Sequence, residues 1–99
     1  MALAELMDRF VGAVSGIGSD ATDEYPDWSY RTFESERAEI AEVWPEIRAA
    51  VFKNHADTVA FVDAKLAESF AHFEARDKLR GRKAMWAIYN LPLTRLAVS

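Results

Sequence analysis

Apolar residues near the N-terminus recur every three or four positions, which is the period of one face of an α-helix. Six of them form a single stripe: Leu3, Leu6, Met7, Phe10, Val11 and Val14. Gly16 and Gly18 follow at once, and glycine readily adopts the left-handed conformation with which many helices end. The pattern predicts an amphipathic helix over residues 2–15.

A second amphipathic stretch follows a connection over residues 17–28 that is rich in turn-forming residues. It begins near Asp27 or Ser29, either of which can cap the first turn. Apolar residues of this stretch recur at helical spacing, with Arg37 at one position of the series. The apolar members of this ladder are Phe33, Ile40, Trp44, Ile47 and Val51. The ladder keeps its phase across Pro45, so we expect a kinked helix rather than a broken one.

A third stretch is the longest, and it spans about residues 57–79. One of its faces carries Val59, Val62, Leu66, Phe70 and Phe73. We expect Gly81 to break the chain, before a short helix over residues 83–90 that Pro92 stops. The terminal stretch over residues 93–98 is apolar and should pack against another part of the protein.

These patterns predict an all-α protein in one domain over residues 1–99. Two long central helices would form an antiparallel hairpin in a small bundle, with a short N-terminal and a short C-terminal helix beside it. At 1.5 Å per residue the longest helix would measure roughly 35 Å, more than a compact monomer of this size needs. We therefore expect a homodimer, in which two helices from each of two chains complete a four-helix core.

The chain contains no cysteine, which excludes a disulfide scaffold, a thiolate zinc site and a cysteine nucleophile. This composition fits a reducing compartment, so we expect a cytoplasmic protein. No apolar run is long enough to span a membrane, and charged residues near the N-terminus interrupt any secretory signal. We expect no membrane association and no cofactor.

The net charge of −4 hides a gradient along the chain. Residues 1–46 carry eleven acids against three bases, whereas residues 76–99 carry one acid against six bases. The second helix thus has a glutamate-rich, solvated side formed by Glu34, Glu36, Glu39, Glu42 and Glu46.

Two histidine-containing pairs are candidates for chemistry. Glu68 and His72 lie four residues apart and share a helix face, but helical di-iron proteins need two Glu-x-x-His units and further glutamates. Arg48 and His55 have a spacing that resembles the Arg-x(4–6)-His motif of HEPN-type ribonucleases, although Ala49 stands where that family usually has a polar residue. We expect no bound metal. A helical metalloprotein or a ribonuclease-like enzyme using His55 or His72 is kept as an alternative.

The segment over residues 76–89 is the most pronounced feature, because five cations are followed by aromatic residues. Its cations could grip phosphates while Trp86 or Tyr89 stacks on a base. Cations also suit a helix C-terminus, however, and most nucleic-acid binders are basic overall. Nucleic-acid binding is therefore the second hypothesis. Alternatively, the segment pairs with the acidic helix, within one chain or across the dimer.

No catalytic motif stands out, so the leading hypothesis is a non-enzymatic interaction or regulatory protein that binds another protein. Aromatic residues are enriched at binding hot spots, and charged faces guide encounter. The residues expected to contact a partner are Trp28, Glu39, Glu42, Trp44, Glu46, Arg80, Arg82, Lys83, Trp86 and Tyr89.

Overall fold

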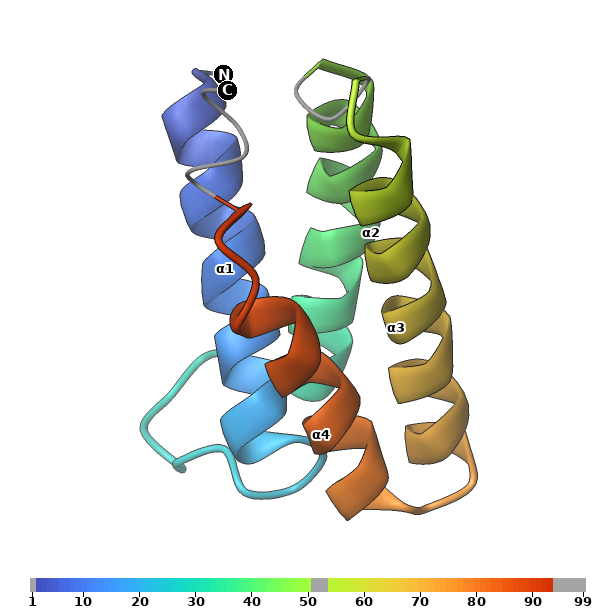
Figure 1. Ribbon diagram of the computed structural model, residues 1–99. Coiled ribbons are helices and arrows are strands. Elements are labelled where there is room, and N and C mark those ends of the chain that lie inside the picture. The colour runs from blue at the N-terminus through green and yellow to red at the C-terminus, as the bar shows by residue number, and fades with distance from the viewer. Residues whose placement is uncertain (1, 51–53, 94–99) are drawn as a thin grey trace.

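The computed structural model describes residues 2–50 and 54–93, and the regular structure in this part of the chain is entirely α-helical (Figure 1). Its helices are α1 (Leu3–Asp20), α2 (Phe33–Ala50), α3 (Ala56–Glu74) and α4 (Lys78–Tyr89). α1 packs closely on both α2 and α4, and α4 packs closely on α3. The all-α prediction is confirmed.

The core lies where α1 faces α2 and α4. Phe10 of α1 is fully buried, and its ring stacks on that of Trp44 in α2 with 5.0 Å between the centroids. Other buried members of this core are Val14, Ile17, Val43, Met85 and Ile88. The stripe predicted for the first helix therefore supplies the centre of the molecule.

The apolar ladders predicted for the second and third helices are also confirmed. α2 continues through Pro45, and its buried face is kept on both sides of the proline. The predicted member Val51 lies outside the described residues. The buried ladder residues are Ile40, Trp44, Ile47, Val62, Leu66 and Phe73, with Phe33, Val59 and Phe70 partly buried against them.

α1 contains 18 residues, as many as α2, so it is not the short flanking helix that the sequence predicted. Its predicted end is wrong because Gly16 and Gly18 lie inside the helix. A Cβ at Gly16 would come within 2.5 Å of Glu36 Oε1, and one at Gly18 within 3.0 Å of Trp86 Cε2. These glycines let neighbouring side chains approach the helix backbone, and they do not cap it.

α2 begins at Phe33, later than the predicted start near residues 27–29. Thr32 and Ser35 cap it reciprocally: Ser35 N donates to Thr32 Oγ1 at 3.1 Å, and Thr32 N donates to Ser35 Oγ at 2.9 Å. This closure satisfies backbone N–H groups that a helix start leaves free. The connection from α1 therefore runs over residues 21–32.

A corner replaces the last turn predicted for the third helix. Arg76 adopts a left-handed backbone with φ 62°, which ends α3. Asp77 then caps α4, because its Oδ1 accepts from Arg80 N at 3.2 Å. The predicted break at Gly81 is wrong: this glycine is buried inside α4, and its carbonyl accepts from Ser69 Oγ at 2.7 Å.

α2 and α3 lie side by side in Figure 1, and polar side chains join them. Arg37 pairs with Glu74 at 3.2 Å, and Arg48 pairs with Asp63 at 2.9 Å. The indole N–H of Trp44 donates to Asp63 Oδ1 at 2.7 Å. These contacts are compatible with the predicted hairpin, while the closest helix packing is that of α1 on α2 and of α3 on α4.

Helices of one chain supply the core that the sequence suggested two chains would share. The Cα radius of gyration is 13.1 Å, close to the ~13 Å typical of a compact domain of about 100 residues. Homodimerisation stays a prediction, and such a contact would use the outer surface. Leu93 is buried, whereas the rest of the predicted apolar tail, residues 94–98, lies outside the described residues. Within residues 2–50 and 54–93, no helix has the length and apolar character needed to cross a bilayer.

Candidate functional site

The two most exposed large apolar side chains in the described part of the chain are Trp28 and Tyr30, with exposed fractions of 86% and 89%. Both lie on the loop over residues 21–32, which joins α1 to α2 (Figure 1). Between them, Ser29 forms a local turn in which its Oγ accepts from Arg31 N at 3.1 Å. The turn leaves the aromatic residues on either side of Ser29 in solvent.

The start of the same loop is anchored to the helices. Tyr25 packs against the core, and burial raises the pKa of its phenol. Glu24 accepts from Lys78 Nζ at 3.0 Å and pairs with Arg82 Nη2 at 3.2 Å, which lowers the pKa of Glu24. Arg82 Nε also donates to the Ala21 carbonyl at 2.6 Å. These contacts fix the start of the loop to α4, and the exposed aromatic residues follow this fixed segment in the chain.

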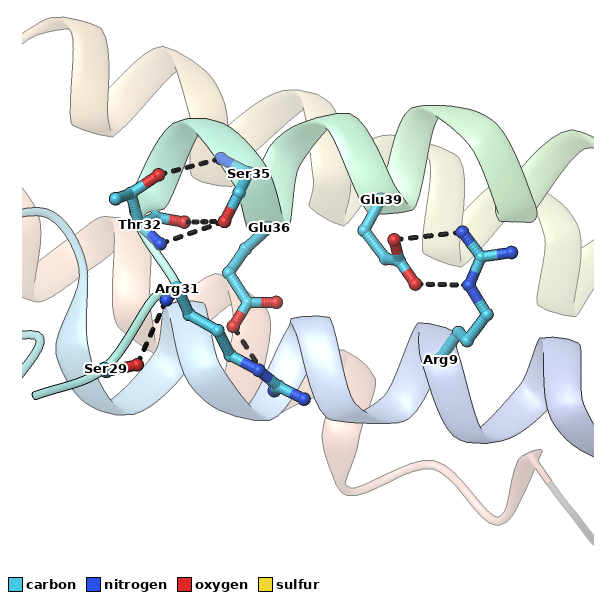
Figure 2. A network of polar contacts seen from close by, with 7 residues as sticks. All are labelled: Arg9, Ser29, Arg31, Thr32, Ser35, Glu36 and Glu39. Carbon is cyan, nitrogen blue, oxygen red and sulfur yellow. Dashed lines mark hydrogen bonds and ion pairs between the residues drawn. The ribbon is translucent and has the colours of Figure 1, made fainter.

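The five glutamates of α2 fall into three environments. Glu39 binds Arg9 of α1 through both carboxylate oxygens (Figure 2), and the hydrogen bond from Arg9 lowers the pKa of Glu39. Glu42 also binds Arg9, at 2.9 Å. Glu34 and Glu46 are exposed, and neither forms an ion pair with another described residue. The fifth glutamate is buried. Near both of its ends, α2 therefore presents a carboxylate that pairs with no cation in the described ranges 2–50 and 54–93.

Glu36 is this buried glutamate; it is only 4% exposed, which corrects its expected place on the solvated side of the helix. Its Oε1 has no hydrogen-bond donor, and Arg31 Nη1 lies 3.5 Å away, too far for a good hydrogen bond (Figure 2). Burial raises the pKa of the Glu36 carboxyl, and the charge of Arg31 offsets part of this effect. The carboxylate fits here because Gly16 of α1 has no side chain.

Glu36 lines a pocket of about 260 Å³ at the junction of the loop and α2. Its other lining residues are Tyr30, Arg31, Ser35 and Glu39. Two walls are held in place, because Glu39 is bound by Arg9 and Ser35 belongs to the helix cap (Figure 2). The pocket thus brings together an exposed aromatic ring, a guanidinium and a buried carboxylate.

Two tryptophans that were expected to contact a partner take part in internal packing. Trp44 is 5% exposed, so in the isolated chain it presents little surface to a partner. Trp86 covers Gly18, and its indole N–H donates to the Gly18 carbonyl at 3.0 Å. Tyr89 packs edge-on against Trp86 with 5.0 Å between ring centroids, and it stays 45% exposed. Of these three aromatic residues, Tyr89 offers the most surface to a partner.

The basic segment is partly neutralised within the chain. Lys78 and Arg82 bind acids of the loop over residues 21–32, and not those of α2 as one alternative expected. Exposed cations remain at Arg76, Arg80 and Lys83, although Arg80 also pairs with Asp77 at 3.5 Å. Nucleic-acid binding stays a prediction, and it would depend on this smaller set of cations.

The residues proposed for chemistry are spread over the fold. Glu68 Oε1 lies 3.9 Å from His72 Nε2, and Glu68 also accepts from Lys65 Nζ at 2.9 Å, which lowers the pKa of Glu68. Arg48 is held in an ion pair with α3, and His55 precedes the first residue of that helix. In the part of the chain that the structure describes, no three His, Asp or Glu side chains gather as a metal site would require. The metalloprotein and ribonuclease-like hypotheses stay predictions.

Sequence reasoning identified Trp28 but missed Tyr30 and Glu36. Tyr30 follows Trp28 by two residues in a polar turn, outside every apolar ladder, and this position was a signal for exposure. Glu36 precedes Ile40 by four residues and so falls on the buried stripe of its helix. A glutamate in register with an apolar ladder was the available signal for the buried carboxylate.

Replacing Glu36 with glutamine is expected to raise the free energy of unfolding at pH 7. Because burial raises the pKa of the Glu36 carboxyl in the folded chain, its contribution to stability is fully present below about pH 4.5 and is lost as the pH rises through the folded-state pKa. The neutral amide avoids this loss. Urea unfolding of both proteins from acidic to neutral pH should show a gap that opens as pH rises. A wild type that is the more stable protein at pH 7 would contradict the burial effect.

The site combines aromatic surface, carboxylates and one guanidinium around a small pocket. This set of groups is suited to recognising a ligand by charge and by ring contact. No protein-family model, curated protein or solved structure matches the chain.

Proposed function

We propose that this chain is a non-enzymatic protein-interaction module that docks a basic partner protein. The docking surface consists of the loop over residues 21–32 and the adjoining acidic face of α2. The observation that carries the proposal is the near-complete exposure of Trp28 and Tyr30, with exposed carboxylates at Asp27, next to Trp28 in the sequence, and at Glu34 in the first turn of α2. In this proposal α2 and α3 form an antiparallel hairpin that supports the surface from behind.

The exposed rings are costly to leave in water and favourable to bury in a contact. A tryptophan or tyrosine buries roughly 150–250 Å² when covered, and such residues are enriched at the centres of protein interfaces. Neither ring joins the core, although Tyr25 of the same loop does. An anchored loop that presents Trp28 and Tyr30 outward matches the anchors of a preorganised interface.

The charge around these rings selects the chemistry of the partner. Glu34 and Glu46 of α2 are exposed and form no ion pair with another described residue, and Asp27 adds another exposed carboxylate on the loop. An acidic surface attracts a basic protein and speeds its approach, whereas it repels nucleic acid. Lys78 and Arg82 of α4 pair with Asp23 and Glu24 at the start of the same loop, and neither pairs with Asp27 or Glu34.

Random peptides displayed on phage and selected against the protein test this proposal. We expect the selected peptides to be rich in arginine or lysine and to bind more weakly as salt is added, because the contact is partly electrostatic. Trp28→Ala should weaken their binding roughly tenfold, equivalent to about 1.4 kcal/mol. Fluorescence anisotropy of labelled peptides gives the dissociation constants.

The matched control is Phe61→Ala, which removes a 40% exposed aromatic ring from α3. This variant should bind the same peptides within about a factor of two of the wild type. Acidic or neutral selected peptides would contradict the proposal, and so would equal losses in the two variants. Tight binding of a nucleic acid that is abolished by Arg80→Ala or Lys83→Ala would favour the second hypothesis instead.

A further inference from the structure

The pocket beside the exposed rings contains a carboxylate oxygen that the fold leaves without a hydrogen-bond donor. Only 4% of Glu36 is exposed to solvent, and its Oε1 accepts no hydrogen bond. Burying an ionised carboxylate without full hydrogen bonding is costly, and such groups are usually paired. Glu36 is therefore a group whose partner is incomplete in the isolated chain.

We propose that this pocket receives one arginine side chain of the partner protein, whose guanidinium donates to the Glu36 carboxylate. The inference rests on the proposed function and names what that surface recognises. Glu39, the other carboxylate in the lining, already has both oxygens bound to Arg9. Glu36 is thus the carboxylate of the pocket that is left to accept from an incoming cation.

Arg31 of the chain itself shows that a guanidinium can reach this carboxylate. Its Nη1 lies 3.5 Å from Glu36 Oε1, and its side chain is 52% exposed, so the contact is long and partly solvated. A partner guanidinium that reached ordinary hydrogen-bond distance would satisfy the oxygen better than Arg31 does. Arg31 acts here as an internal competitor that the partner displaces.

The walls of the pocket favour arginine over lysine. The planar guanidinium can donate two parallel hydrogen bonds to one carboxylate and can also stack on an aromatic ring, which the compact ammonium of lysine does less well. Tyr30 provides such a ring in the pocket lining, and Ser35 adds a hydroxyl. On its other side, the Glu36 carboxylate packs against Gly16, where a Cβ would lie 2.5 Å from Oε1.

Titration with N-acetyl-argininamide, followed by ¹⁵N and ¹³C NMR, tests the inference without a partner protein. We expect saturable shifts at Gly16 and at residues 30–36, together with a lowered pKa of the Glu36 carboxyl in its ¹³Cδ titration. N-acetyl-lysinamide should bind more weakly. Chemical-shift changes that do not saturate would overturn the inference. Changes of equal size at every glutamate of α2 would also overturn it.

Two variants and one control sharpen this test. Glu36→Gln keeps the shape but not the charge, and it should weaken binding of the arginine probe roughly tenfold. Glu46→Gln makes the same charge change at an exposed site of α2, and it should leave binding within about a factor of two. Arg31→Ala should tighten binding because it removes the competitor, a gain that a misfolded variant would not show.

The outcomes separate this inference from the proposed function. If the selected basic peptides depend on Trp28 but bind Glu36→Gln as well as they bind the wild type, the docking surface stands and the arginine pocket is wrong. If the arginine probe binds at Glu36 while Trp28→Ala changes no peptide affinity, the pocket stands and the aromatic docking surface is wrong.

Discussion

Phe10→Ala is expected to lower the free energy of unfolding by about 3–5 kcal/mol, the usual cost of removing a fully buried aromatic side chain. Phe10 is 0% exposed and stacks on Trp44, so its loss opens a cavity where α1 meets α2. A domain of this size is stable by only about 5–15 kcal/mol, so the variant should lose a large part of its stability. Urea unfolding followed by circular dichroism measures the change.

The control for this prediction is Leu3→Ala on the same helix. Leu3 is 42% exposed, so its truncation removes far less buried surface and should change stability by only about 0.5 kcal/mol. The tryptophan fluorescence of Phe10→Ala should also shift, because Trp44 loses its stacked neighbour. A cost as small as that of Leu3→Ala would mean that α1 does not form the centre of the core.

Alanine substitutions at Gly81 and Gly12 are expected to change stability in opposite directions. A Cβ at Gly81 would lie 2.8 Å from Cε1 and Cζ of the Phe73 ring, which is buried at the contact of α3 and α4. Overpacking of this kind costs about 1–3 kcal/mol. At Gly12 the nearest atom to a new Cβ is Arg31 Nη1 at 3.9 Å, so alanine gains helix propensity of about 0.5–1 kcal/mol without a clash.

Thermal and urea unfolding of the two variants provide the comparison. Because both changes replace a glycine inside a helix with alanine, the difference between them isolates the contact with Phe73. Phe73→Leu in the Gly81→Ala background should recover part of the loss, because the smaller side chain leaves room for the new methyl group. If Gly81→Ala were stabilising, the close approach of α3 and α4 described here would be incorrect.

The candidate site was only partly predictable from sequence. Trp28 was proposed as a contact residue because aromatic residues are enriched at binding hot spots, and the acidic character of the second helix followed from its glutamates. The roles of Trp44 and Trp86 could not be assigned, because the same residue type serves cores and interfaces. Their partners, Asp63 and the Gly18 carbonyl, are 19 and 68 residues away in the chain.

The periodic spacing of apolar residues by itself determined that the chain is helical and which face of each helix is buried. Local hydrogen bonding and side-chain sterics repeat at helical spacing, so Phe10, Ile40 and Leu66 could be placed on buried stripes without knowing their neighbours. The charge gradient was equally a property of the sequence.

Only the tertiary structure decided what the glycines and Glu36 do. Gly16 and Gly18 were expected to end the helix, yet they lie within α1, where the absence of a side chain leaves room for Glu36 and Trp86. The burial of Glu36 likewise depends on the space that Gly16 leaves on the neighbouring helix. Such contacts join residues far apart in the chain, and their energy is set by how two helices meet, which no local pattern encodes.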